Sequence, residues 1–369
     1  MNQFKLHTNV YLGRNALERL KELPIRKACV VCDPFLVQNG GVKKVTDPLD
    51  EMGAQWELFD QVIPNPTVEL VSAGVAHILE FRPDTVIALG GGSAIDTGKA
   101  ISFIYTKSSG AAKPRCIAIP TTSGTGSEVT SFSVLSDPEA GAKYPLVDDA
   151  MLPEIAMLDP ALTITVPPHV TADTGMDILT HAVEAYASPA ATDFTDALAE
   201  KAFALVLEYL PRAFRDGQDC EAREKLHSAS CMAGMAFNNA TLGLCHGMAH
   251  AMGELLHLPH GRSNALLLPH VIAFNSDDSG AKAKYAKLAR LAGCCCHTEQ
   301  VAVQGLVRRI TGLMNEVGIA HRLTREEDRT RLIQEMDRAA KLALEDRCTA
   351  GNCRSAVPEQ IKEIYQKIL

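Results

Sequence analysis

The stretch DTVIALGGGSAIDTGKA, residues 84–100, decides the fold class. Its first half is an apolar run typical of a buried strand, and three glycines, Gly90 to Gly92, separate it from a segment with helical character. We expect Ser93 to open this helix, with Asp96 completing an N-capping pattern. A glycine-rich turn leaves backbone N–H groups uncovered at a helix N-terminus, where a pyrophosphate binds well. The motif is neither G-x-G-x-x-G nor a P-loop, so a plain tight turn is the alternative.

Similar apolar runs occur on both sides of this stretch, and segments with helical spacing lie between the first four. Such strand–helix alternation predicts an α/β domain with a mainly parallel sheet, a Rossmann-like dinucleotide-binding architecture. A hairpin is predicted within residues 132–147. The other predicted strands are KACVVCD (27–33), QWELF (55–59), CIAIP (116–120) and IAMLD (155–159).

The pattern changes after Val166-Pro167-Pro168, where long helical patterns begin and strand-like runs stop. A chain of 369 residues also exceeds the size at which one core keeps growing. We therefore expect an α/β nucleotide-binding domain at residues 1–167 and an all-helical, metal-binding domain at residues 168–369.

Composition excludes several classes of protein. The net charge of −8, without a basic run, argues against a nucleic-acid partner. No stretch of 18 apolar residues and no apolar signal core at the start occur, which predicts a cytoplasmic protein without a membrane span. The eleven cysteines show no disulfide framework, so we expect reduced thiols; the role of the Cys294-Cys295-Cys296 triplet stays open.

Two further features suggest a nucleotide site. The segment IPTTSGTGSEVTS, residues 119–131, offers many hydroxyl and N–H donors directly after a predicted strand, where open α/β sheets bind ligands. A solvated loop is the alternative. Asp33 ends the first predicted strand, where its carboxylate could bind a ribose diol and favour NAD over NADP. It could equally be a turn residue before Pro34.

A histidine block, LCHGMAHAMGELLHLPHG at residues 244–261, indicates a metal site. His246 and His250 stand four residues apart and share a helix face, as do Asp177 and His181 upstream. Imidazoles with a carboxylate and no thiolate favour iron or zinc. Spacing alone pairs His246 with His250 and leaves three others open, and crowded surface histidines are the alternative. The open ones are His257, His260 and His270.

Together these features resemble the iron-containing, or group III, alcohol dehydrogenase family over essentially the whole chain. The most specific motifs are GGGSAID (90–96), PTTSGTGSE (120–128) and the histidine block. The segments at 143–160, 171–189 and 193–202 are similar to a branch of 1-propanol dehydrogenases from 1,2-propanediol-degrading microcompartments.

The resemblance implies Asp177, His181, His246 and His260 as metal ligands, and His250 as a proton-handling catalytic group instead of a ligand. It implies NAD contacts from Asp33, Asn65, Gly91, Gly92, Ser93, Thr121, Thr122, Ser127, Lys143 and Leu158.

The resemblance further implies an enzyme that uses Fe(II), with Zn(II) as the alternative metal, and NAD(H) to interconvert a short-chain aldehyde and a primary alcohol. Propanal and 1-propanol are the expected pair; ethanol, lactaldehyde and 1,3-propanediol are alternatives. A homodimer and microcompartment enzymes or shell proteins are the implied partners.

Other classes of protein are less consistent with these residues. A dehydroquinate-synthase-like lyase needs a cluster of basic residues to hold a phosphorylated substrate. The predicted metal-binding segments are flanked mainly by apolar and small residues, and Arg262 is the one basic residue close to them. A non-catalytic scaffold would not need the combination of loops and histidines. One departure from the family is Asn352-Cys353-Arg354 where Asn-Pro-Arg is common, in a turn far in sequence from the site.

Overall fold

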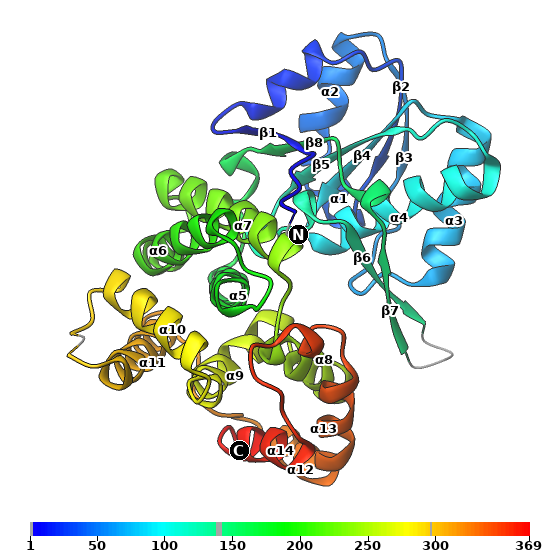
Figure 1. Ribbon diagram of the computed structural model, residues 1–369. Helices are drawn as coiled ribbons and strands as arrows, with labels where there is room; N and C mark the ends of the chain where they lie inside the picture. The colour runs from blue at the N-terminus through cyan, green and yellow to red at the C-terminus, as the bar shows by residue number, and fades with distance from the viewer. Residues whose placement is uncertain (1–2, 138–141, 296) are drawn as a thin grey trace. The chain divides into compact units, whose positions relative to one another are not determined.

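The computed structural model describes residues 3–137, 142–295 and 297–369 (Figure 1). The chain divides into two compact units. One comprises Leu6–Thr165, and the other combines Met1–Lys5 with Val166–Leu369.

The first unit is built on a six-stranded sheet in the order β1-β8-β5-β4-β2-β3, in which every neighbouring pair is parallel. This confirms the predicted parallel sheet. Strand β1 was not expected from the sequence, because a four-residue edge strand with mixed exposure carries little apolar signal. The antiparallel pair β6 and β7 confirms the predicted hairpin. The strands are β1 (Asn9–Leu12), β2 (Lys27–Val31), β3 (Gln55–Phe59), β4 (Thr85–Gly90), β5 (Arg115–Pro120), β6 (Phe132–Asp137), β7 (Ala142–Val147) and β8 (Ile155–Leu158).

Helices cover both faces of this sheet, which explains why its inner strands β2, β4 and β5 are almost entirely buried. Alternate side chains of β2 enter different cores: Val30 packs with residues of η1 (Ala16–Glu22) and α2 (Lys43–Glu51). Val31 packs with residues of α3 (Val68–Phe81) and α4 (Gly92–Ser109) on the opposite face. Cys29 and Cys32 likewise point to opposite faces, and no disulfide joins cysteines in the described part of the chain.

The strand order places the nucleotide motifs at one edge of the sheet. From β2 the chain moves outward to β3 and then returns to the other side of β2 as β4. Open α/β sheets bind ligands at such a reversal, outside the carboxyl ends of the strands. Asp33 follows β2 there and caps the short helix α1 (Pro34–Gln38), while Gly90 ends β4.

The second unit contains only helices among its described regular elements. Helix α5 (Pro168–Ala187) packs against α6, α7 and α9, and every residue from Gly175 to Ala187 is buried. The other helices are α6 (Asp193–Arg215), α7 (Cys220–Ala240), α8 (Leu244–Leu256), α9 (His260–Asn275), α10 (Ser279–Leu291), α11 (Glu299–Glu316), α12 (Glu326–Gln334), α13 (Met336–Glu345) and α14 (Pro358–Gln366), with short 3-10 turns η2 (Ser127–Val129), η3 (Asp149–Met151) and η4 (Pro160–Leu162) in the first unit and η5 (Thr349–Gly351) in the second.

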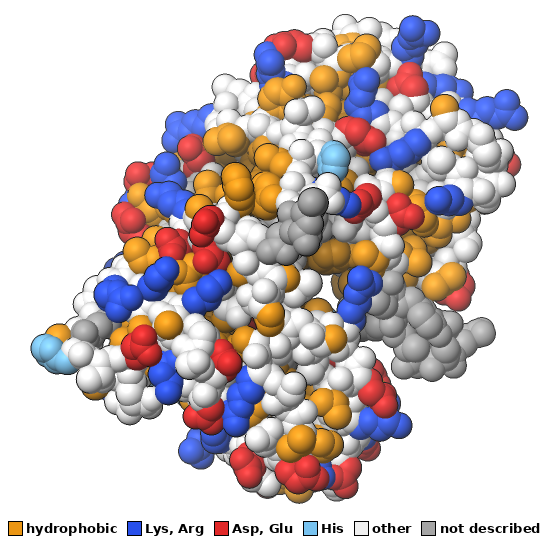
Figure 2. All heavy atoms as spheres, in the orientation of Figure 1, with side chains coloured by type: hydrophobic (Ala, Val, Ile, Leu, Met, Phe, Trp, Pro, Cys, Tyr) orange, Lys and Arg blue, Asp and Glu red, His pale blue; other side chains and the backbone are white. Residues whose placement is uncertain are grey.

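The surface carries mixed charges. On the face shown in Figure 2, Lys and Arg side chains are interspersed with Asp and Glu. Among the described residues, no helix is both long and apolar enough to span a membrane.

The buried Lys99 and the partly buried Asp96 hold the loop after β5. Asp96 does not complete an N-cap as predicted, because α4 begins at Gly92 with Gly91 as its cap. Its carboxylate instead accepts hydrogen bonds from the Ser127 hydroxyl and, at 3.0 Å, from the backbone N–H of Val134. The buried Lys99 ammonium donates to the Ser127 carbonyl at 3.0 Å and pairs with Asp96 at 3.2 Å.

Glu128, in the same loop, is 2% exposed. Burial raises the pKa of its carboxyl to about 7, although its backbone N–H and the Lys99 charge act in the opposite direction. Because the folded pKa lies above the unfolded value, the folded state binds the proton more tightly, and the free energy of unfolding falls as pH rises from about 4.5 to about 7.

We predict that Glu128→Gln removes this dependence. Without added nucleotide, the free energy of unfolding of the variant should rise relative to that of the wild type by up to about 3 kcal/mol as the pH increases from 5 to 8, since one pKa unit corresponds to about 1.4 kcal/mol. Urea unfolding at both pH values measures the difference. Parallel pH profiles for the two proteins would show that the buried carboxyl does not shift on folding.

Candidate metal centre and nucleotide-binding loops

Four potential metal ligands come together in the helical unit. Asp177 and His181 lie on α5, His246 on α8 and His260 at the start of α9, and one donor atom from each lies within 4.8 Å of the others. The Asp177, His181 and His246 side chains are buried, whereas that of His260 is 39% exposed. The cluster is therefore buried except on the side of His260, whose side chain is partly accessible.

The geometry of these donors fits a divalent cation. Asp177 Oδ1 lies 3.4 Å from His260 Nε2 and 3.7 Å from His246 Nε2. Ligands at about 2.1 Å from a tetrahedral ion are about 3.4 Å apart, so the spacing needs little adjustment. The Asn264 amide nitrogen lies 2.7 Å from Asp177 Oδ1 and 3.2 Å from Nε2 of both histidines. The lone pairs thus converge on one point, and a positively polarised group already faces them.

The electrostatics of the cluster also favour positive charge at this point. Burial alone would raise the pKa of the Asp177 carboxyl, but His181, His260 and His246 hold that pKa well below its usual range. The His260 side chain is only partly exposed, and desolvation together with the neighbouring histidines lowers the pKa of its ring to about 3, which favours a neutral imidazole with a lone pair for a metal. Burial also opposes the charge on His246, yet Glu184 and Asp177 raise the pKa of its ring to about 9. The buried carboxylate therefore attracts a proton or a cation.

The close approach of α9 to α5 depends on Gly261. A Cβ atom at this position would lie 2.0 Å from the Asp173 carbonyl oxygen and 3.2 Å from Asp177 Cβ. Only glycine lets α9 begin so near to α5, and this proximity brings His260 next to Asp177.

His250 lies outside this group of four. Its ring stacks on His260 with centroids 5.1 Å apart, while its Nδ1 lies 2.8 Å from Asp346 Oδ2. With Cys348, these two residues form a second group of potential ligands. The i, i+4 spacing of His246 and His250 located the site, but the structure pairs His246 with His260 from the next helix.

The remaining polar residues of the block have other surroundings. Arg262 donates to Asp173 at 2.6 Å, so its charge is already paired. A phosphorylated substrate, as in the lyase alternative, would have to compete for it. His257 is exposed at the end of α8, and His270 is half-buried.

The two loops of the predicted nucleotide site meet at the carboxyl ends of β4 and β5. The Thr121 N–H donates to the Gly90 carbonyl at 2.9 Å, and a Cβ on Gly92 would lie 2.7 Å from Thr125 Cγ2. The glycines therefore allow close packing of the loops and leave Gly91, Gly92, Ser93, Thr121 and Thr122 partly accessible.

The other predicted nucleotide contacts differ in accessibility. Asp33 is partly exposed and caps α1 through the Leu36 N–H, at 3.1 Å. Ser127 is buried with its hydroxyl donated to Asp96, and Leu158 is the buried last residue of β8. Asn65 is exposed, with a positive φ of 54°. Lys143 lies in β7, but its side chain is outside the described part of the structure.

Three residues that lie next to the four potential metal ligands or to His250 were not identified from the sequence. Glu184 lies seven residues after Asp177 on the same face of α5, and Asn264 lies four residues after His260 on α9. Helical spacing could have found both. Asp346 is 96 residues from His250, and no local signal connects the two.

Comparison with known proteins agrees with this geometry. A model described as iron-containing alcohol dehydrogenase matches residues 7–160, and one described as the C-terminal part of the Fe-containing alcohol dehydrogenase family matches residues 171–369. The chain belongs to the iron-containing alcohol dehydrogenase family. The predicted family, α/β plus helical fold and dehydrogenase class are thereby confirmed.

Relatives and solved structures extend over the full chain. It is 42% identical to the 1-propanol dehydrogenase PduQ of Citrobacter freundii, covering 100% of both. A crystal structure of a 1,3-propanediol oxidoreductase matches with a TM-score of 0.94 at 35% identity, also covering 100% of both chains. A sulfoacetaldehyde reductase from Bifidobacterium kashiwanohense, in complex with NAD⁺, matches with a TM-score of 0.88 at 28% identity, covering 100% of this chain and 98% of that one. The predicted cofactors, iron and NAD(H), agree with the family and with this complex.

We predict that Asp177→Ala abolishes retention of the metal, because it removes the only carboxylate from the cluster. Metal content after gel filtration of Fe(II)- or Zn(II)-loaded protein measures this. His257→Asn is the matched control, since this exposed histidine of the same block has a left-handed backbone that Asn tolerates. Full metal content in Asp177→Ala would place the metal elsewhere.

Proposed function

We propose that this protein is an iron-dependent, NAD(H)-linked dehydrogenase that interconverts propanal and 1-propanol and so regenerates NAD⁺. The observation that carries the proposal is the cluster of three imidazoles and one buried carboxylate in a chain similar along its full length to a 1-propanol dehydrogenase. The paired Arg262 disfavours the lyase alternative, which needs free cationic groups for its substrate.

The four residues of the cluster, Asp177, His181, His246 and His260, would hold the metal. When bound, a divalent cation polarises a substrate oxygen, and the nicotinamide donates or accepts the hydride. The neutral His260 ring and the ionised Asp177 carboxylate give the cation both a lone pair and a compensating charge.

His250 would exchange the proton that accompanies hydride transfer. The ring is 34% exposed, so it can exchange protons with solvent, and its stacking on His260 keeps it beside the cluster. With Asp346 accepting from Nδ1, the Nε2 atom is the one available to a substrate.

The glycines and hydroxyl residues at the ends of β4 and β5 would bind the nucleotide through Gly91, Gly92, Ser93, Thr121 and Thr122. The partly exposed Asp33 would accept hydrogen bonds from the ribose and disfavour a 2′-phosphate. The further contacts we propose are Asn65, Ser127, Lys143 and Leu158.

We assign nucleotide binding to residues 1–167 and metal binding to residues 168–369. The motif resemblance also supports a homodimer that works in the cytoplasm, inside a 1,2-propanediol-degrading microcompartment with its other enzymes or shell proteins.

Reconstitution tests the function. We predict that metal-free protein loaded with Fe(II) reduces propanal through multiple turnovers with NADH, with a higher kcat/KM than with NADPH; the Zn(II)-loaded protein shows which metals support activity. Ethanal, lactaldehyde and 3-hydroxypropanal serve as comparison substrates, and the Asp177→Ala variant is the negative control. A higher kcat/KM for 3-hydroxypropanal would instead favour the activity named for the 1,3-propanediol oxidoreductase.

We predict that His250→Asn lowers kcat about 100-fold or more, because general acid–base groups contribute 10²–10⁴-fold to a rate. The metal content should stay at the wild-type level, since His250 lies outside the cluster of four. Loss of metal in this variant would make His250 a ligand, and unchanged kcat would exclude it as the proton-handling group.

A further inference from the structure

The helix that carries His246 lacks a capping side chain of its own. Helix α8 begins after Gly243, which serves as its N-cap and has no side chain to accept a hydrogen bond. The first N–H groups of a helix have no partners within the helix, and leaving them buried without acceptors is costly. His246 lies in this first turn, so whatever holds the helix start also places the metal ligand.

Glu184, from the helix α5 that carries Asp177 and His181, supplies two of the missing acceptors. Its carboxylate accepts from the Gly243 N–H at 3.0 Å and from the Cys245 N–H at 2.7 Å. The oxygen that binds Gly243 also lies 2.5 Å from His246 Nδ1. One buried carboxylate therefore caps α8 and contacts its metal-ligating ring.

The contact with Glu184 decides which ring nitrogen faces the metal. A carboxylate that accepts from Nδ1–H leaves Nε2 as the nitrogen that can give up its proton and bind a metal, and His246 Nε2 is the atom that lies 3.7 Å from Asp177 Oδ1. Without this acceptor the ring could rotate or adopt the other tautomer, and its lone pair would leave the cluster.

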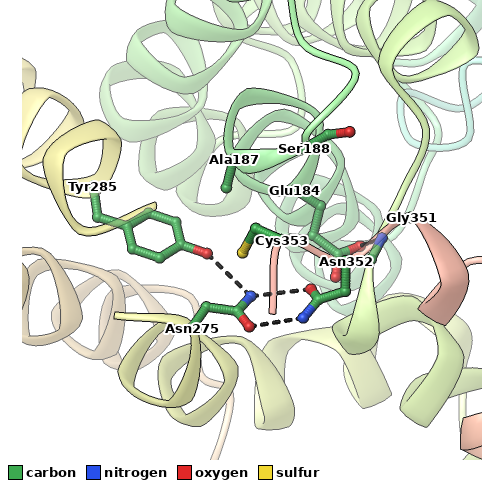
Figure 3. A pocket seen from close by; sticks show the side chains of 9 residues that line it. Glu184, Ala187, Ser188, Asn275, Tyr285, Gly351, Asn352 and Cys353 are labelled. Atoms are coloured by element: carbon green, nitrogen blue, oxygen red, sulfur yellow. Dashed lines mark hydrogen bonds between the residues drawn. The ribbon is translucent and has the colours of Figure 1, made fainter. Parts of the chain in front are cut away.

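Asn352 supplies a third acceptor. Its Oδ1 accepts from the Leu244 N–H at 3.1 Å. The amide is held in this orientation by a reciprocal pair with Asn275, at 2.8 and 3.1 Å, and Asn275 in turn donates to Tyr285 (Figure 3). A Cβ at Gly243 would lie 2.7 Å from Asn352 Oδ1 and 3.0 Å from Glu184 Oε1, so glycine is needed for both to approach.

The turn at Asn352-Cys353-Arg354 therefore lies beside the start of α8, although the two are about 100 residues apart in sequence. The backbone at Asn352, with φ −69° and ψ 144°, has the conformation that a following proline would impose. The turn has this extended backbone although Cys353, and not a proline, follows Asn352.

We propose that Glu184 and Asn352 are positioning residues for the metal ligand His246: Glu184 orients its ring, and both hold the first turn of the helix that carries it. The inference depends on the metal centre proposed above.

Zn(II) affinity, measured by competition with a chelator, tests this inference without relying on activity. In Glu184→Gln an NH₂ group, which cannot accept a hydrogen bond, replaces one of the two carboxylate oxygens. Depending on the orientation of the amide, the variant loses the acceptor for the Cys245 N–H or the acceptor shared by Gly243 and His246. We expect Zn(II) to bind this variant about 10- to 100-fold more weakly, the usual effect of losing a partner of a metal-bound histidine. For Asn352→Ala, which leaves the His246 contact in place, we expect a loss of about three- to tenfold.

Thr298→Ala is the matched control for a purely structural effect. Thr298 caps α11 in the same unit through the Val301 N–H, far in sequence from the metal ligands. This variant should lower the Tm of the metal-free protein and leave Zn(II) affinity unchanged. Folded Glu184→Gln protein with an affinity within twofold of the wild type would overturn the role of Glu184, and the same result for Asn352→Ala would overturn that of Asn352.

A measurement on the wild type covers the case in which Glu184→Gln does not fold. In ¹⁵N-histidine-labelled protein bound to Zn(II), His246 should keep its proton on Nδ1 and bind the metal through Nε2; the opposite tautomer would contradict the inference. Asp177→Ala separates this result from the proposed function. If that variant binds Zn(II) normally, the metal centre itself is wrong, whereas normal binding by Glu184→Gln alone refutes only the positioning role.

Discussion

The buried carboxylate of Asp177 is the constraint on which the helical unit depends. A charge in the middle of a fully buried helix segment is unfavourable unless positive charge or hydrogen-bond donors surround it. Here three imidazoles and the Asn264 amide converge on it. The surrounding helices are placed accordingly, since Gly261 allows α9 to approach α5 and Gly243 allows Glu184 to reach the start of α8. A cation satisfies the same requirement and adds Lewis acidity.

In the α/β unit, the loops that we propose for nucleotide binding offer backbone groups, whereas the metal centre that we propose in the helical unit uses side chains. The inner strands of the sheet in the α/β unit face an apolar core on each side, and the candidate ligand-binding groups lie in the loops at the carboxyl ends of the strands. Gly90 to Gly92 expose their backbone there and let the neighbouring loop pack closely. Lys99 and Asp96 hold the second loop through a buried and a partly buried hydrogen bond, respectively. Both residues thus support this loop, whereas the sequence suggested only a helix cap for Asp96 and nothing for Lys99.

The sequence predicted the parts of the fold that local patterns encode. Five strands of the sheet, the hairpin and the change to helices follow from apolar runs and periodicity. Strand β1 escaped because its four half-exposed residues gain their stability from pairing with β8, not from burial. Asp96 was misread because a capping pattern and a loop-holding carboxylate look alike until the partner, Ser127, is brought near.

For the site, the sequence alone determined the chemistry. Glycines after a strand favour a nucleotide, and histidines with a carboxylate at helical spacing favour a divalent metal. Only the tertiary structure decided which residues act together. His260 joins Asp177 because two helices cross at Gly261, and His250 turns to Asp346 across 96 residues. Asn352 reaches the first turn of α8 from near the end of the chain. Spacing reports neighbours on one helix, whereas contacts between helices depend on how their side chains pack, which no local pattern records.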